Sequence, residues 1–129
     1  MARPAAVAVA IACVLLALPA TTGAHRFNAK TTAEIQEGGP AGAYGFVYSP
    51  KRSCRGNRLV ELFRVSDTDA PDQSYGTDRS DPSGNWRIVA PLIAGEYYLT
   101  VKKSRASSAA QGRKHRHKCK SGRSKRKQL

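Results

Sequence analysis

The run from Cys54 to Arg64, Cys-Arg-Gly-Asn-Arg-Leu-Val-Glu-Leu-Phe-Arg, constrains the fold most, because it joins a cysteine to the most strand-like stretch of the sequence. Branched or aromatic side chains recur from Leu59 to Val65, broken only by Glu61 and Arg64. This pattern is typical of a strand that buries one face and leaves the other partly wet. It predicts the central strand of a small antiparallel sheet.

Further short strand-like runs surround this one, and turn residues separate them. The run 43–48 carries three aromatic residues on one side by the period of two, and the run 96–101 alternates with Tyr97, Leu99 and Val101 on one side. Asp81-Pro82-Ser83-Gly84-Asn85 places proline and glycine where a tight turn needs them, just before Trp86. Turn signals about every ten residues predict an all-β chain folded as an antiparallel β-sandwich.

The first 24 residues predict a secretory signal peptide. An uncharged apolar run from Ala5 to Leu18 follows Arg3, and small residues lead up to Ala24. About fourteen apolar residues are short for a membrane span, which needs about 20. We therefore expect cleavage after Ala24, a secreted or extracellular protein, and no membrane span in the mature chain.

Cleavage would leave 129 − 24 = 105 residues, enough for one small domain, and two of the three cysteines, Cys54 and Cys119. In an exported protein such a pair is most simply an internal disulfide, although a reduced pair or a crosslink between two chains would also satisfy the sequence. Closing a loop of about 65 residues would stabilise the fold by about 4 kcal/mol in the chain-entropy model.

The basic charge is confined to the end of the chain. Residues 25–101 hold nine Lys or Arg and nine Asp or Glu, whereas residues 102–129 hold twelve Lys or Arg and no acid. Composition predicts that this last segment cannot bury enough apolar surface to fold alone. The cations most suited to binding a polyanion are Arg113, Lys114, Arg116, Lys118, Lys120, Arg123, Lys125, Arg126 and Lys127.

No pattern in the sequence predicts catalysis, a cofactor or a metal. The familiar nucleophile, metalloprotease, phosphate-loop and dinucleotide motifs are absent. Alternation places His115, His117 and Cys119 on one side of an extended chain, but neighbouring cations and an oxidised Cys119 would oppose a metal. The acids of residues 67–72 lack the spacing and glycine of an EF-hand loop.

The aromatic residues allow two interpretations. They could present a face for sugars, or they could pack in the core and across strands, and the period of two on strands favours packing. Only one of them, Tyr98, is expected to be exposed, because it lies on the opposite side of its strand from Tyr97. The aromatic residues concerned are Tyr44, Tyr48, Trp86, Tyr97 and Tyr98.

Four motifs in this order resemble the carboxypeptidase regulatory-like, or transthyretin-like (prealbumin-like), domains of secreted bacterial proteins. They are Gly45-Phe46-Val47-Tyr48-Ser49, the run 54–62, Asp81-Pro82-Ser83-Gly84-Asn85-Trp86 and the run 94–101. The resemblance covers roughly residues 44–124 and implies an immunoglobulin-like sandwich of about seven strands and a bond between Cys54 and Cys119. It also implies a last strand after Cys119, which is expected to be short or frayed because residues 125–129 lack apolar alternation.

The sequence thus predicts four regions: a signal peptide (1–24), an amino-terminal segment with a possible edge strand (25–43), a sandwich core (44–101) and a basic segment with the second cysteine and a short last strand (102–129). We expect a non-enzymatic structural or interaction module outside the cell, with an unknown protein or cell-envelope partner. The alternative is a polyanion binder that uses the basic segment on nucleic acid, teichoic acid or anionic lipid.

Overall fold

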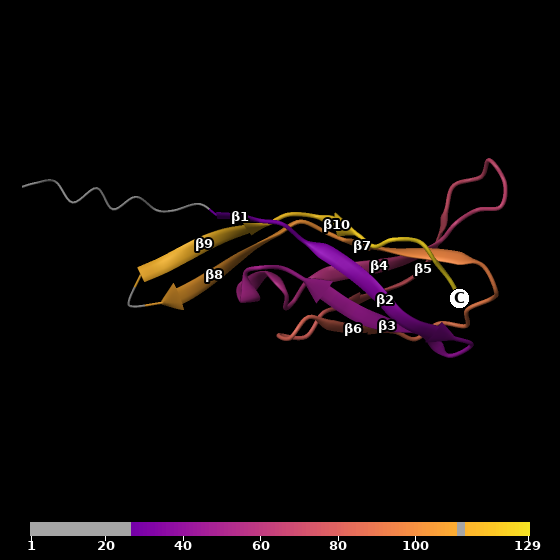
Figure 1. The fold of residues 1–129 in the computed structure, drawn as a ribbon, viewed down its shortest axis with the longest axis horizontal. Coiled ribbons are helices and arrows are strands. Elements are labelled where there is room, and N and C mark those ends of the chain that lie inside the picture. The colour runs from indigo at the N-terminus through magenta and orange to yellow at the C-terminus, as the bar shows by residue number, and fades with distance from the viewer. Residues whose placement is uncertain (1–26, 111–112) are drawn as a thin grey trace, which may run out of the picture.

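A computed structural model describes residues 27–110 and 113–129 and confirms the predicted class: the chain is an all-β sandwich with mainly antiparallel pairing and one disulfide (Figure 1). The signal-peptide prediction for residues 1–24 lies outside the described residues. Within the described residues, no helix is both long and apolar enough to cross a membrane.

Two sheets form the sandwich, and each is named here after its central strand. The β3 sheet has the order β2 (Thr32–Gly39), β3 (Gly42–Tyr48), β6 (Asn85–Ile88). The β4 sheet has the order β10 (Gly122–Arg123), β7 (Glu96–Val101), β4 (Leu59–Arg64), β5 (Gln73–Arg79), and β11 (Lys127–Gln128) also pairs with β7.

A third sheet extends beyond the sandwich, and we call it the arm. It consists of β1 (Phe27–Ala29), β9 (Arg113–Cys119) and β8 (Ser104–Ala110), in that order. β8 and β9 form an antiparallel hairpin, and β1 joins β9 in parallel. Figure 1 shows the hairpin continuing away from the sandwich on the side where β1 lies.

β4 is the central strand that the sequence predicts. It pairs with β5 on one side and β7 on the other, and Val60 and Leu62 are completely buried. The inward side of β7 supplies Tyr97, Leu99 and Val101 to the same core, as the alternation predicts. These side chains meet Val47, Trp86 and Ile88 from the β3 sheet, so one apolar layer joins the two sheets.

The tight turn before Trp86 also forms as expected. Gly84 has a φ of +99°, a conformation that side chains other than glycine rarely adopt. The Asp81 carboxylate accepts hydrogen bonds from the backbone N–H groups of Ser83 and Asn85 and from the Asn85 side chain, and these bonds lower the pKa of Asp81. The turn delivers Trp86 into the core, where it is only 2% exposed.

The prediction of packing is wrong for two tyrosines of β3. The three aromatic residues do share a face, but it is the outer face: Tyr44 and Tyr48 are 44% and 45% exposed. The opposite face of β3, which carries Ala43, Gly45 and Val47, is the buried one. A Cβ on Gly45 would lie 2.9 Å from the Trp86 ring, so the indole occupies the space that a larger residue would fill.

The basic segment, predicted to be unable to fold alone and to carry one short last strand, contains more strands than that. Four of the eleven strands in the described residues, β8 to β11, lie within it, which is why the total exceeds the seven or so expected. β10 and β11 are short, with two residues each, and both pair with β7. Hydrogen bonds between backbone strands, rather than buried apolar side chains, therefore stabilise this segment.

The disulfide joins Cys54, at the end of the short helix η1 (Arg52–Cys54), to Cys119 at the end of β9. Both cysteines are buried, at 0% and 1% exposure, in a small cluster with Ala29 and Ala106. The bond spans 65 residues and fixes the base of the arm to the connection between β3 and β4.

A chain cleaved after Ala24, as the sequence predicts, should contain no free thiol, because Cys54 and Cys119 are the only cysteines after residue 24. Maleimide labelling in denaturant, before and after reduction, checks this: we expect no label before reduction and two equivalents after it. One or two equivalents before reduction would contradict an internal bond, and a dimer on a non-reducing gel would show a crosslink between chains instead.

Candidate functional site

The arm carries an exposed row of cations on one face. Along β9 the exposure alternates, with Arg116 and Lys118 exposed and His117 and Cys119 buried. Arg105 of β8 is the cross-strand partner of Lys118, so these two like charges lie on the same face. Lys120 is exposed directly after β9, and Lys30 is exposed directly after β1.

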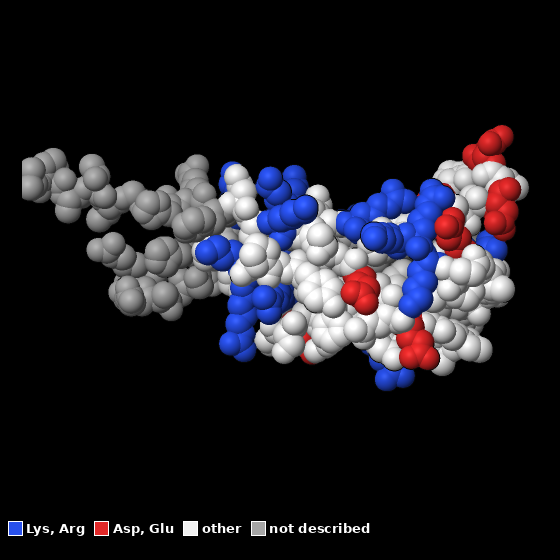
Figure 2. Space-filling view, viewed as in Figure 1, with Lys and Arg blue, Asp and Glu red and all other residues white. Residues whose placement is uncertain are grey.

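Nothing in the described part of the protein neutralises these cations. The three ion pairs among the described residues join Arg64 to Asp67, Lys102 to Glu61 and Arg126 to Glu96, and none of them involves the arm. The last acid in the sequence is Glu96, so neither hairpin strand contains one. Figure 2 shows Lys and Arg near the arm and along the adjoining edge of the sandwich, with several acids at the opposite end.

A buried arginine anchors the arm where it leaves the sandwich. The guanidinium of Arg58, only 1% exposed, donates to the backbone carbonyl oxygens of Cys54 (2.7 Å), Lys102 (2.8 Å) and Lys120 (2.7 Å) and to the Thr31 hydroxyl (3.1 Å). These contacts hold the chain just after β1, just before β8 and just after β9, so one end of each arm strand is fixed at the sandwich. Burial lowers the pKa of Arg58, but a guanidinium stays charged at any physiological pH.

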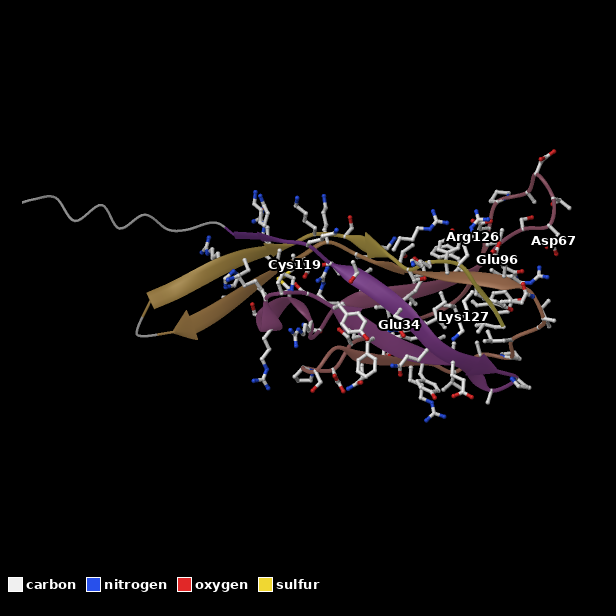
Figure 3. All side chains as sticks on the ribbon, viewed as in Figure 1. Glu34, Asp67, Glu96, Cys119, Arg126 and Lys127 are labelled. Carbon is white, nitrogen blue, oxygen red and sulfur yellow. A yellow bond between two sulfur atoms is a disulfide. The ribbon has the colours of Figure 1, made fainter. Side chains whose placement is uncertain are left out.

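The nine cations predicted to bind polyanions fall into two groups in the structure. Arg116, Lys118 and Lys120 belong to the arm face; Arg113 and Lys114 precede them on β9, and their side chains lie outside the described part of the structure. The remaining four, Arg123, Lys125, Arg126 and Lys127, lie on the sandwich. Figure 3 shows this separation, with Cys119 at the base of the arm and Arg126 and Lys127 on the sandwich.

Three cations of the sandwich group have internal partners. Arg126 lies 3.3 Å from Glu96, and the ammonium of Lys127 donates to the backbone carbonyl oxygens of Ile35 and Gln36 on β2. The guanidinium of Arg123 lies over the Tyr98 ring, 3.6 Å from its centroid. These contacts attach the end of the chain to the sandwich, so the group is less available to a ligand than the arm face.

The expectation that Tyr98 is exposed is wrong. Tyr98 does lie on the outer face of the β4 sheet, but Phe63 stacks beside it at 5.3 Å and Arg123 covers it, leaving 7% exposed. Its hydroxyl donates to Asp72, whose pKa is lowered first by the hydrogen bond from the Ser66 N–H and then by this bond from Tyr98. The sequence places Arg123 far from Phe63 and Tyr98, so only the fold reveals the contact.

The two patterns considered for metals do not form a site in what the structure describes. Cys119 is in the disulfide, and the side chain of His115 lies outside the described residues. Asp72 bonds to Ser66 and Tyr98, while Asp67 pairs with Arg64. No group of three His, Cys, Asp or Glu residues that could hold a metal occurs among the described residues.

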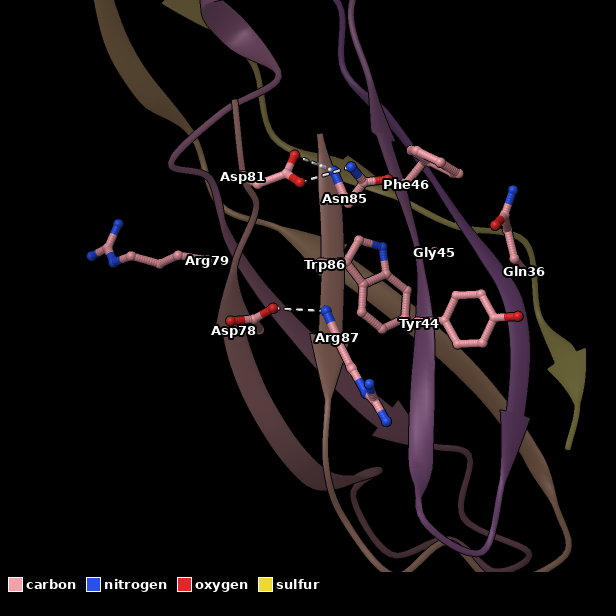
Figure 4. A pocket seen from close by; sticks show the side chains of 10 residues that line it. All are labelled: Gln36, Tyr44, Gly45, Phe46, Asp78, Arg79, Asp81, Asn85, Trp86 and Arg87. Carbon is pink, nitrogen blue, oxygen red and sulfur yellow. Dashed lines mark hydrogen bonds between the residues drawn. The ribbon is translucent and has the colours of Figure 1, made fainter. Parts of the chain in front are cut away.

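Tyr44 and Phe46 of β3 border an open groove of about 690 Å³. All three strands of the β3 sheet contribute to its lining (Figure 4). β3 supplies Tyr44 and Phe46, β2 supplies Gln36, and β6 supplies Asn85 and Arg87. The hydroxyl of Tyr44 donates to Glu37 at 2.7 Å, which raises the pKa of Tyr44.

Comparisons with known proteins identify no relative: no family model, no curated protein and no solved structure matches the chain. The resemblance to carboxypeptidase regulatory-like domains therefore stays a prediction. Any function has to be argued from the arm and the groove themselves.

Proposed function

We propose that this protein is a non-enzymatic extracellular module that binds linear polyanions through the cationic face of its arm. The single observation that carries the proposal is a row of cations exposed on and directly after a folded hairpin, with no counter-charge among the described residues: Arg105, Arg116, Lys118 and Lys120. Like charges on neighbouring strands destabilise the hairpin, and an anionic ligand would relieve their repulsion.

The distribution of charge along the chain also favours this function. Residues 25–101 carry balanced charge, so long-range attraction of an anion has to come from the basic segment. Within that segment, the sandwich group is partly occupied by Glu96, Tyr98 and the β2 backbone, whereas the arm cations are free of such contacts in the described residues. We therefore place most of the binding on the arm.

The extracellular location is part of the proposal and rests on two observations. Residues 1–24 have the layout of a signal peptide, and the Cys54–Cys119 disulfide suits an oxidising compartment. The ligand is accordingly a polyanion found at or outside the cell envelope. Recognition by charge alone is insensitive to sequence, so we expect sulfated glycans and nucleic acids both to serve as probes.

Replacing two arm cations should weaken polyanion binding and reduce its salt dependence. For R116Q/K118Q, counterion release predicts that the slope of log affinity against log salt for duplex DNA becomes shallower by up to about 1.8 units. Fluorescence anisotropy with labelled DNA, and competition with heparin, measure the slope between low and moderate salt. Circular dichroism and the melting temperature show whether the variant keeps its fold.

The matched control is R79Q/R87Q, which removes the same charge from two exposed arginines of β5 and β6. This variant should keep the wild-type slope. If both variants reduced the slope equally, net charge alone would set the affinity. If R116Q/K118Q left the slope unchanged, the polyanion site would lie outside the arm face. Absence of measurable binding by the wild-type protein at low salt would leave only a structural module.

A further inference from the structure

The outer face of the β3 sheet is built from cross-strand rows that each place an aromatic ring beside polar side chains. In one row Glu34, Phe46 and Asn85 are register partners on β2, β3 and β6. In the next row Glu37, Tyr44 and Arg87 are partners, and Tyr48 follows beside Thr32. Alternate residues of a strand are about 6.6 Å apart, so the three rings form a line along β3.

The two tyrosine rings on this line are held in place while remaining exposed. Tyr44 and Tyr48 donate their hydroxyl hydrogens to Glu37 and Glu34, at 2.7 and 3.2 Å. The Tyr48 and Phe46 rings contact each other at a centroid distance of 5.9 Å. Both tyrosines still expose more than two fifths of their surface, so a ligand would meet apolar surface that is already partly ordered, which reduces the entropy cost of binding.

The groove adds hydrogen-bonding groups from β2 and from β6, on the two sides of the rings. Gln36, Asn85 and Arg87 are exposed along it, and Figure 4 shows these side chains around the Tyr44 and Phe46 rings. The Arg87 and Gln36 side chains have no hydrogen bond or ion pair within the described residues. The face therefore offers donors on β6 and carboxylate acceptors on β2, with apolar rings between them.

We propose that this face binds a carbohydrate chain. A pyranose ring presents an apolar C–H face that packs on an aromatic ring, and an equatorial rim of hydroxyls that both donate and accept hydrogen bonds. The rows on β3 match this combination, because each aromatic ring lies beside a side chain on a neighbouring strand that can donate or accept a hydrogen bond. The charged side chains of the face and groove are of both signs, which favours an uncharged ligand over the polyanion proposed for the arm: Glu34, Glu37, Asp78 and Asp81 are acidic, and Arg79 and Arg87 are basic.

The alternative occupant, another protein, fits this face less well. Protein interfaces concentrate their apolar residues in a dry centre from which charged residues are depleted, whereas here carboxylates hydrogen-bond the tyrosines within the aromatic line itself. The open form of the groove also suits a chain that runs along β3. Association of two copies remains one outcome that the experiment below distinguishes.

The test measures retention of the exported protein on insoluble cellulose, chitin and peptidoglycan in 1 M salt, which screens the arm. We expect wild type to sediment with at least one of them, and Y44A and Y48A each to weaken retention by about tenfold or more. Y44F/Y48F keeps both rings and should retain most of the binding. R116Q/K118Q should bind as wild type, which separates this site from the proposed function of the arm.

V89A is the matched control for the loss of exposed apolar surface, because Val89 is 76% exposed outside the aromatic line. It should sediment as wild type does. Failure of the wild-type protein to bind all three polysaccharides would overturn the proposal, as would retention that Y44A and Y48A leave unchanged. A dimer by light scattering that Y44A converts to a monomer, without polysaccharide binding, would assign the face to self-association instead.

Discussion

Arg58→Met is expected to destabilise the protein by about 3 kcal/mol or more, because it leaves several buried acceptors without their charged donor, at about 1–3 kcal/mol for each group left unsatisfied. The side chain is 1% exposed and donates to three backbone carbonyls and one hydroxyl. Methionine fills a similar volume but donates no hydrogen bond. The carbonyls of Cys54, Lys102 and Lys120 would then lose this partner at the base of the arm.

Urea unfolding of wild type, Arg58→Met and Arg58→Lys measures the effect. Lysine keeps the charge but has a single ammonium group, which cannot reach four acceptors in the fork geometry of a guanidinium, so we expect an intermediate loss. Amide exchange in β8 and β9 should increase before that in β4 and β7, because Arg58 joins the arm to the sandwich. A stability change below about 1 kcal/mol for Arg58→Met would show that these bonds contribute little.

The role of Arg58 could not be predicted from the sequence. In the sequence it is one of nine cations in a segment of balanced charge, and nothing near it marks it as buried. Its acceptors come from Thr31, Cys54, Lys102 and Lys120, which only the fold brings together. Three of the four are backbone carbonyls, which carry no residue-specific signal.

The arm was missed for a related reason. Composition measures how much apolar surface a segment can bury, and residues 102–129 have little, yet the hairpin is held by backbone pairing, the disulfide and Arg58. A signal was nevertheless present. Basic residues at 114, 116, 118 and 120 alternate with His115, His117 and Cys119, and this period of two is typical of a strand with one covered face.

For β3 the predicted alternation of side chains was correct, but the prediction that its aromatic side faces the core was wrong. Alternation shows that Tyr44, Phe46 and Tyr48 share a side, but it does not show which side faces the core. The side of Gly45 faces the core, and a Cβ there would clash with the Glu34 backbone oxygen of β2 and would lie 2.9 Å from the Trp86 ring of β6, so packing from both neighbouring strands requires a residue without Cβ. The position of the aromatic face therefore depends on a pairing between strands some forty residues apart, which single-strand patterns do not contain.

Trp86→Ala should also cost about 3–5 kcal/mol, the range for removing a buried large aromatic side chain. Trp86 is 2% exposed and belongs to the core cluster that contains Val47, Val60 and Leu62. Because its ring lies against Gly45, its cross-strand partner on β3 has no side chain to fill the space left behind. Such a loss is a large fraction of the 5–15 kcal/mol that ordinarily stabilises a domain.

The measurement is urea unfolding followed by far-ultraviolet circular dichroism, since the protein has a single tryptophan and the variant loses its fluorescence. V89A should stay within about 0.5 kcal/mol of wild type, as expected for an exposed position. Trp86→Phe should lose less than Trp86→Ala, because it keeps an aromatic ring and removes an indole N–H that is buried without a hydrogen-bond partner in the described residues. If the alanine variant unfolds as wild type does, Trp86 does not fill the core and the outward orientation of Tyr44 and Tyr48 loses its explanation.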